Sequence, residues 1–169
     1  MGDTIAASRP DLVSSLLTAH HMPQSLARNL IHLIYSTKNR EACLPDQLRP
    51  KLYAYKSGIL KTWESPAVAI GGVADHVHVL CVLSKNHSLA KIVEEIKKGT
   101  SKWLKTQGLR DFGWQAGYGA FSVSESKSSQ VVSYIERQKM HHRKLSFQDE
   151  FRTFLKRHGV QFDERYTWD

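Results

Sequence analysis

Two histidines placed two positions apart have the clearest potential for chemistry in this sequence. His76 and His78 lie in the run Asp75-His76-Val77-His78-Val79-Leu80-Cys81-Val82-Leu83, which follows a glycine pair and has the Val-rich composition of a β-strand. Successive side chains of a strand point to opposite faces, so both imidazoles project from one face and the residues between them face a core. This pattern indicates either half of a metal site or two polar residues on a solvated strand face.

A second group of polar side chains recurs at helical spacing later in the chain. Tyr134 and Gln138 are four residues apart, which places them on one face of a helix predicted from about Ser126 to Arg143. His141 falls near the same face and His142 follows it, but surface histidines are common, so both stay outside the predicted set of ligands. A phenol and a neutral amide on one face are unusual for a helix that only packs.

These two groups together favour phosphoryl transfer. A catalytic divalent ion takes about three protein ligands, so a third ligand must join His76 and His78. The helix offers Gln138 as that ligand and Tyr134 as a nucleophile that attacks a phosphate in line. The simpler alternatives are that Tyr134 packs against the sheet and that Gln138 is solvated. The absence of thiolates among these residues argues against a structural zinc site.

The same motifs resemble a known family. His76-Val77-His78 resembles the His-hydrophobic-His motif of the HUH nucleases. Tyr134-x-x-x-Gln138 is similar to the tyrosine helix of the single-strand transposases of the insertion sequence 200 type and their repeat-associated (REP) relatives. Residues 31–40 and 114–123 also resemble segments of that family. The resemblance covers roughly residues 22–159, which leaves out the start and the end of the chain.

The resemblance implies a specific activity. His76, His78 and Gln138 would hold Mg²⁺ or Mn²⁺, and Tyr134 would attack single-stranded DNA to give a 5′-phosphotyrosine and a free 3′-hydroxyl. The DNA partner would carry hairpins at the ends of a mobile element. Transposases of this family are typically homodimers in which the tyrosine helix of one subunit completes the histidine pair of the other. Repeat-associated relatives can act as monomers, so both states stay open.

The charge of the chain independently favours a polyanionic partner. The formal net charge is +8 and the pI is about 9.6, which favours nucleic acid. No run approaches the roughly 20 apolar residues of a membrane span, and no secretory signal is recognisable, so the predicted location is the cytoplasm and no membrane partner is expected. The candidate DNA contacts are Lys97, Lys98, Lys102, Lys105 and Tyr118. The lysines can equally form the solvated face of a helix, and the aromatic stretch around Tyr118 can equally be a core strand.

The elements that must position these residues follow from hydrophobic periodicity. Strands are predicted at about 29–37, 66–73, 75–83 and up to Val123, with helices at about 45–63, 88–107, 126–143 and 147–157. The resulting β-α-β-β-α-β order predicts an α+β, ferredoxin-like antiparallel sheet, with an added C-terminal helix that carries the tyrosine. Residues 22–160 form one predicted domain, preceded by an N-terminal extension, residues 1–21, and followed by a tail, residues 161–169.

Two other functions fit the sequence as well. The first is a non-catalytic, ferredoxin-like nucleic-acid-binding module, such as a domesticated relative of the transposases. Its weakness is that both histidines, the tyrosine and the glutamine are all present. The second is a metal-dependent RNA nuclease that uses the same histidines, and a preference for ribose substrates would reveal it.

Overall fold

The computed structural model describes residues 25–142, 146–164 and 167, so the predicted extension over residues 1–21 lies outside the described residues. Four strands form one antiparallel sheet in the order β2-β3-β1-β4. The strands are β1 (Asn29–Ser36), β2 (Ala67–Gly72), β3 (His76–Leu83) and β4 (Gly119–Val123). With α1 after β1 and α2 after β3, the order is β-α-β-β-α-β, which confirms the ferredoxin-like α+β fold.

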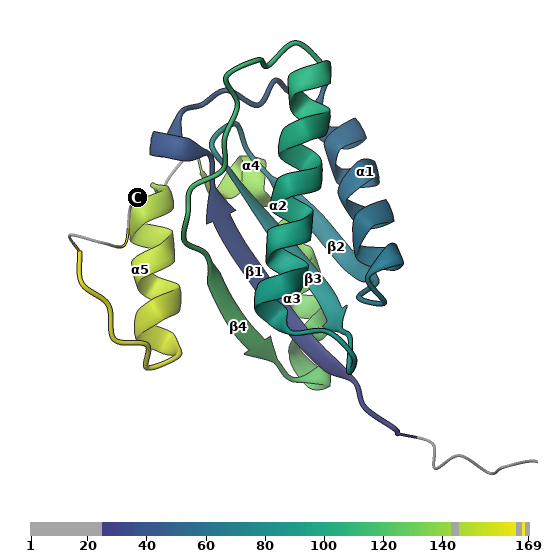
Figure 1. Ribbon diagram of the computed structural model, residues 1–169. Coiled ribbons are helices and arrows are strands. Elements are labelled where there is room, and N and C mark those ends of the chain that lie inside the picture. Colours follow the sequence, from purple (N-terminus) through teal and green to yellow (C-terminus); the bar gives the residue numbers. More distant parts are fainter. Residues whose placement is uncertain (1–24, 143–145, 165–166, 168–169) are drawn as a thin grey trace, which may run out of the picture.

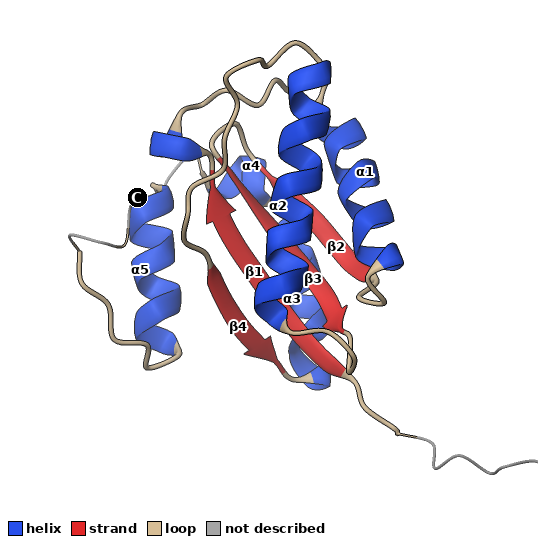
Figure 2. Cartoon of the chain, viewed as in Figure 1, coloured by secondary structure: helices blue, strands red, loops and turns tan. Residues whose placement is uncertain are grey.

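Helices cover both faces of this sheet (Figures 1 and 2). The longer ones, α1 (Arg49–Thr62) and α2 (Leu89–Thr106), pack on one face. The other face is covered by α3 (Ser128–Glu136), α4 (Gln138–His141) and α5 (Phe147–Arg157). Two 3-10 turns, η1 (Lys38–Arg40) and η2 (Glu125–Lys127), complete the described elements.

The alternation of side chains along the central strands sets the composition of the two layers. Leu33 of β1 and Val79 of β3 join the core beneath α1 and α2. Their neighbours Ile34 and Leu80 point to the opposite layer, which α3 and α5 close. One face of the sheet therefore carries a large hydrophobic core, and His76 and His78 lie in the second layer, as the period of two predicts.

The helix predicted over residues 126–143 is interrupted. A 3-10 turn precedes α3, and the backbone leaves the helical region at Arg137 (φ −93°, ψ 11°) before α4 resumes at Gln138. No glycine or proline lies there, so local sequence gives no sign of the break. The break coincides with a tertiary contact, because the Gln138 amide bonds to a buried carboxylate of α5. By contrast, α2 begins as predicted, with the Ser88 hydroxyl accepting the Lys91 N–H as an N-cap.

No helix in the described part of the chain is both long and apolar enough to cross a membrane.

Candidate functional site

The histidine pair lies at the centre of the sheet. His76 and His78 are both fully buried, and β1 and β2 flank their strand on either side. In the register, His78 pairs with Gly71 of β2. A side chain at Gly71 would lie 2.5 Å from the carbonyl oxygen of Ile135 in α3. The missing side chain therefore lets α3, which carries Tyr134, approach the sheet next to the histidines.

Tyr134 reaches the pair within the same chain. Its ring centroid lies 5.8 Å from that of His78, in an edge-to-face arrangement. Its hydroxyl donates a hydrogen bond to Glu150 of α5. The sequence predicted that a tyrosine and a histidine pair converge, and the fold brings them together without a second subunit.

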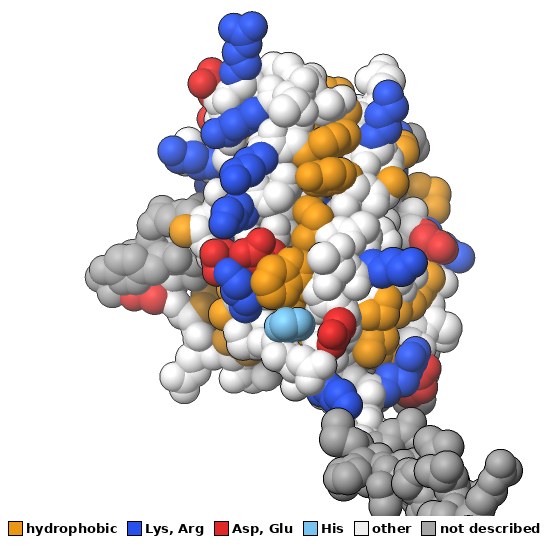
Figure 3. Space-filling model, turned by 45° about the vertical axis from the view of Figure 1, so that its right-hand side comes forward, with side chains coloured by type: hydrophobic (Ala, Val, Ile, Leu, Met, Phe, Trp, Pro, Cys, Tyr) orange, Lys and Arg blue, Asp and Glu red, His pale blue; other side chains and the backbone are white. Residues whose placement is uncertain are grey.

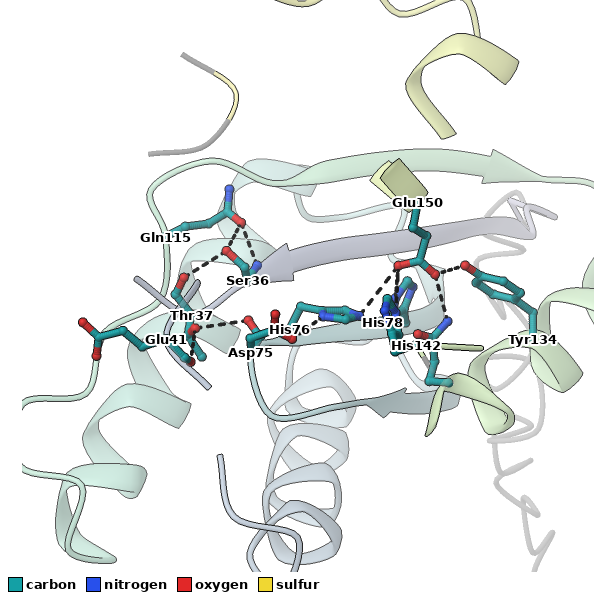
Figure 4. Close-up of polar contacts among 11 residues, drawn as sticks. Ser36, Thr37, Glu41, Asp75, His76, His78, Gln115, Tyr134, His142 and Glu150 are labelled. Carbon is teal, nitrogen blue, oxygen red and sulfur yellow. Dashed lines mark hydrogen bonds and ion pairs between the residues drawn. The ribbon is translucent and has the colours of Figure 1, made fainter. Parts of the chain in front are cut away.

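Glu150 lies where all these side chains meet (Figure 4). Its carboxylate is 2% exposed. Oε1 accepts hydrogen bonds from the Tyr134 hydroxyl and, at 3.2 Å, from the Gln138 amide nitrogen. Oε2 lies 3.7, 3.5 and 3.1 Å from the Nε2 atoms of His76, His78 and His142 respectively. One carboxylate thus links the proposed nucleophile to three imidazoles.

The donor set fits a divalent metal ion. Ligand atoms of His76, His78, His142 and Glu150 all lie within 4.8 Å of one another. Among the described residues, His76 Nε2 and Gln138 Oε1 have no hydrogen-bond partner, although both atoms are buried. A buried polar atom without a partner is costly, so a ligand that such atoms can bind is expected. Imidazole, carboxylate and amide donors together suit a first-row divalent ion or Mg²⁺ better than a thiolate-preferring metal.

Two further residues fix the orientation of the imidazoles. The Nδ1 of His76 lies 2.7 Å from Asp75 Oδ1, and the Nδ1 of His78 lies 3.0 Å from His32 Nε2. Each of these contacts leaves the Nε2 atom facing Glu150. Burial, with a smaller effect of the charge on His158, lowers the pKa of His32 to about 4, so His32 is neutral at pH 7 and can accept the His78 Nδ1–H. The nitrogens available to a metal are therefore the Nε2 atoms.

Hydrogen bonds from residues at the C-terminal end of β1 hold Asp75 in place. The backbone N–H of Thr37 donates to the Asp75 carbonyl at 2.7 Å, and the Thr37 hydroxyl donates to the same oxygen at 3.1 Å. The neighbouring Ser36 N–H donates to Gln115 Oε1 at 2.7 Å (Figure 4). The Ser36-Thr37 and Trp114-Gln115 segments, which contributed to the family resemblance, thus hold the turn that carries Asp75 in place.

The candidate DNA contacts have different surroundings. Lys97, Lys98, Lys105 and Tyr118 line one open groove, of about 540 Å³, between α2 and the segment before β4, whereas Lys102 does not line it. The Lys97 ammonium donates to the carbonyls of residues 115, 116 and 117 at 3.0, 3.1 and 2.7 Å, and burial lowers its pKa to about 8. Lys97 therefore anchors this segment. Tyr118 is 37% exposed, and Figure 3 shows a column of Lys and Arg side chains along this part of the helical face.

Sequence reasoning missed two members of the site. The sequence patterns do not point to Glu150 and place His142 outside the predicted ligands, yet both residues lie with His76 and His78. The available signal was a carboxylate within the apolar stripe of a helix, because Glu150 lies between the buried Phe147 and Phe151. A charged residue on such a face is rarely buried without a partner. The side chain of His141 lies outside the described residues.

Glu150 predicts an unusual pH dependence of stability. Burial, reinforced by the nearby Asp75, raises the pKa of Glu150 from 4.5 to about 8. Because the folded state holds this proton more tightly than the unfolded state, the associated stability is present below about pH 4.5 and is lost as pH rises through about 8. In chelator-treated protein, we expect Glu150→Gln to reduce the fall in unfolding free energy between pH 5 and 9. The unfolding free energies are measured by urea titration at each pH. An equal fall with pH in the two proteins would contradict the assignment.

Comparisons with known proteins agree with this geometry. Residues 25–138 match the family described as IS200-like transposases, well over half of the 169 residues. A presumed transposase from Deinococcus radiodurans has a similar structure, with a TM-score of 0.53 and 25% sequence identity over 69% of this chain and 98% of that chain. A REP-associated tyrosine transposase, solved with a REP hairpin, gives a TM-score of 0.55 and 16% identity over 72% and 73% of the two chains. No curated protein sequence matches the chain.

Proposed function

Because this chain belongs to the IS200-like transposase family, we propose that it cleaves and rejoins single-stranded DNA through a covalent bond between Tyr134 and a 5′ phosphate. The observation that carries the proposal is the meeting of Tyr134, His76, His78 and Gln138 around Glu150, in a fold shared with tyrosine transposases. The match ends at Gln138, so the helix that supplies Glu150 lies beyond it.

The proposed reaction is an in-line phosphoryl transfer. The ionised form of Glu150 takes the proton of the Tyr134 hydroxyl, whose hydrogen bond its Oε1 accepts. The phenolate oxygen then forms a bond to phosphorus as the bond from phosphorus to the 3′ oxygen breaks. The departing 3′ oxygen takes this proton from Glu150 and leaves as a hydroxyl, which returns Glu150 to its ionised form. Rejoining reverses these steps with the 3′-hydroxyl of another strand end, so the bond energy is conserved in the phosphotyrosine.

We propose that His76, His78 and Glu150 hold Mg²⁺ or Mn²⁺, with Gln138 as a further ligand through its amide oxygen. A divalent cation bound there would offset the negative charge of the phosphate that is attacked. Glu150 Oε1 accepts from the Gln138 nitrogen, which fixes the amide plane and leaves Oε1 of Gln138 for the metal. His142 lies close enough to take part, since its ring centroid is 4.3 Å from that of His76.

The DNA substrate and the assembly are also part of the proposal. A relative of the same fold was solved with a REP hairpin, so we propose hairpin-bearing single strands as substrate. Lys98, Lys105 and Tyr118 are the proposed contacts along the groove beside α2, and Lys102 is a weaker candidate. Of the two states that the sequence leaves open, homodimer and monomer, we propose a monomer with a complete active site, because Tyr134 contacts His78 within one chain. A cytoplasmic location stays a prediction.

The direct test uses labelled single-stranded DNA hairpins incubated with the protein and Mn²⁺. A band that survives denaturation and contains both protein and DNA is the expected result. Binding without such a band would favour the non-catalytic module. Cleavage of RNA hairpins without a covalent product would favour the RNA nuclease.

His32 provides a separate prediction about the metal site. Leucine at this position cannot accept the His78 Nδ1–H, so the imidazole loses the contact that orients it. Changes of this kind typically cost about 10–100-fold in metal affinity. We expect His32→Leu to weaken Mn²⁺ binding to that extent in calorimetric titrations, and His32→Gln, which keeps an acceptor, to recover part of the loss. Wild-type affinity in a folded leucine variant would contradict the role of His32.

A further inference from the structure

A pocket of about 390 Å³ lies beside Tyr134, between β4, α3 and α5. Nothing in the proposed chemistry uses it. Its volume falls within the range of roughly 300–1,000 Å³ typical of sites for small ligands. Because Tyr134 forms part of its wall, any group that fills the pocket lies next to the proposed nucleophile.

The inner wall of the pocket is aromatic. Phe121 and Phe154 stack with ring centroids 5.4 Å apart, and Phe154 meets His32 and Tyr134 edge to face at 5.2 and 5.7 Å. The rings therefore form a continuous surface that runs from the sheet edge to Tyr134. A flat π-system is well matched to such a wall, because base–aromatic stacking is worth about 1–3 kcal/mol per base.

The outer rim is polar and basic. Lys127 and Arg157 line the pocket, and no acidic residue does. Both side chains are exposed, and neither forms an ion pair with any residue that the structure describes. Ser122 and Gln130 add hydrogen-bonding groups at the same rim. An aromatic wall beneath a cationic rim is complementary to a nucleotide, with the base inside and the phosphates at the edge.

We propose that this pocket binds the unpaired nucleotide next to the phosphate that Tyr134 attacks, with its base against Phe154 and Phe121 and its flanking phosphate on Lys127 and Arg157. This inference rests on the proposed function and adds a substrate contact to it. It assigns to α5 a second role besides the supply of Glu150. The pocket would fix the position of the strand, so that one phosphate is presented to the tyrosine.

The first test compares two neighbouring cations of α5. Arg157 lines the pocket and Lys156 does not, although both are exposed in the last turn of the helix. Binding of a fluorescent single-stranded hairpin oligonucleotide is measured by anisotropy in EDTA, so that no cleavage occurs. We expect Arg157→Ala to weaken binding about 3–10-fold and to lower the dependence of log K on log salt by about 0.7, the value for one phosphate contact on a single strand. Lys156→Ala should change the affinity less than twofold, and equal effects of the two substitutions would overturn the phosphate contact.

The second test addresses the base. A single abasic site is moved along the unpaired flank of the oligonucleotide, and the affinity is measured at each position. One position should cost the wild type about 5–150-fold, as expected for loss of one stacked base. Gln130→Trp, which fills the pocket from the exposed face of α3, should remove that sensitivity. A flat profile for the wild type, or the same peak in the filled variant, would overturn the proposal. A covalent adduct formed by the wild type alongside a flat profile would leave the proposed function standing.

Discussion

Tyr134→Phe is expected to abolish covalent attachment of DNA while leaving DNA binding within about twofold of the wild type. The substitution removes one oxygen and keeps the ring, which packs against His32 and Phe154. Removal of a covalent nucleophile costs on the order of 10³-fold or more in rate. Adduct formation should therefore fall to background in a denaturing gel assay, with binding followed in parallel by anisotropy.

The matched control is Tyr55→Phe. Tyr55 is 41% exposed on α1 and stacks on Trp103, on the face of the sheet opposite Tyr134. The Tyr55→Phe protein should form the adduct at the wild-type rate. Persistence of the adduct in the Tyr134 variant would mean that another residue is the nucleophile.

His76→Ala and His78→Ala are each expected to abolish cleavage, and a chelator should reproduce the effect in the wild type. Each substitution removes a proposed ligand from a buried site and takes one of the three neighbouring imidazoles away from Glu150. Loss of a ligand should cost more than the roughly 10–100-fold typical of groups that only support ligands. Calorimetry with Mn²⁺ measures the affinity, and gel assays measure the cleavage.

His87→Ala serves as the control for the histidine substitutions. His87 lies in the loop before α2, where its ring contacts Trp63, and it is not one of the proposed metal ligands. Its replacement should leave metal binding and cleavage unchanged. Cleavage by the wild type that is indifferent to EDTA would eliminate the metal from the mechanism.

The sheet and the direction of its side chains could be predicted because both depend on local periodicity. An alternation of two places His76 and His78 on one face whatever the rest of the chain does. Helical spacing likewise places Tyr134 near Gln138. The two elements meet because Gly71 permits close approach of α3. The sequence shows the glycine pair, but it does not show that Ile135 is the residue that packs against Gly71.

Glu150 and His142 could not be predicted in the same way. Glu150 lies 16 residues from Tyr134 in sequence, on a helix whose position is set by packing of Phe147 and Phe151 against β1 and β4. Such contacts are decided by tertiary packing, which local patterns do not report. The break at Arg137 has the same origin, since it accompanies the bond between Gln138 and Glu150.

The lysines of α2 illustrate a different limit. Sequence places Lys97 and Lys98 in one basic run, but burial and three carbonyl partners separate Lys97 from its exposed neighbour. A count of charges cannot distinguish an anchor from a candidate phosphate contact. The roles of these lysines toward DNA remain predictions. Substitutions that remove the charge of Lys98 or Lys105 would measure how much each contributes to DNA affinity.

Mapping the covalent adduct tests the central claim most directly. The protein is incubated with a single-stranded hairpin and Mn²⁺, the DNA is digested with nucleases, and the peptides are sequenced by mass spectrometry. We predict that the residual nucleotide is joined through its 5′ phosphate to Tyr134, in the peptide that also contains Gln130 and Glu136. A nucleotide on any other residue, a 3′-linked nucleotide, or cleavage without an adduct would contradict the account.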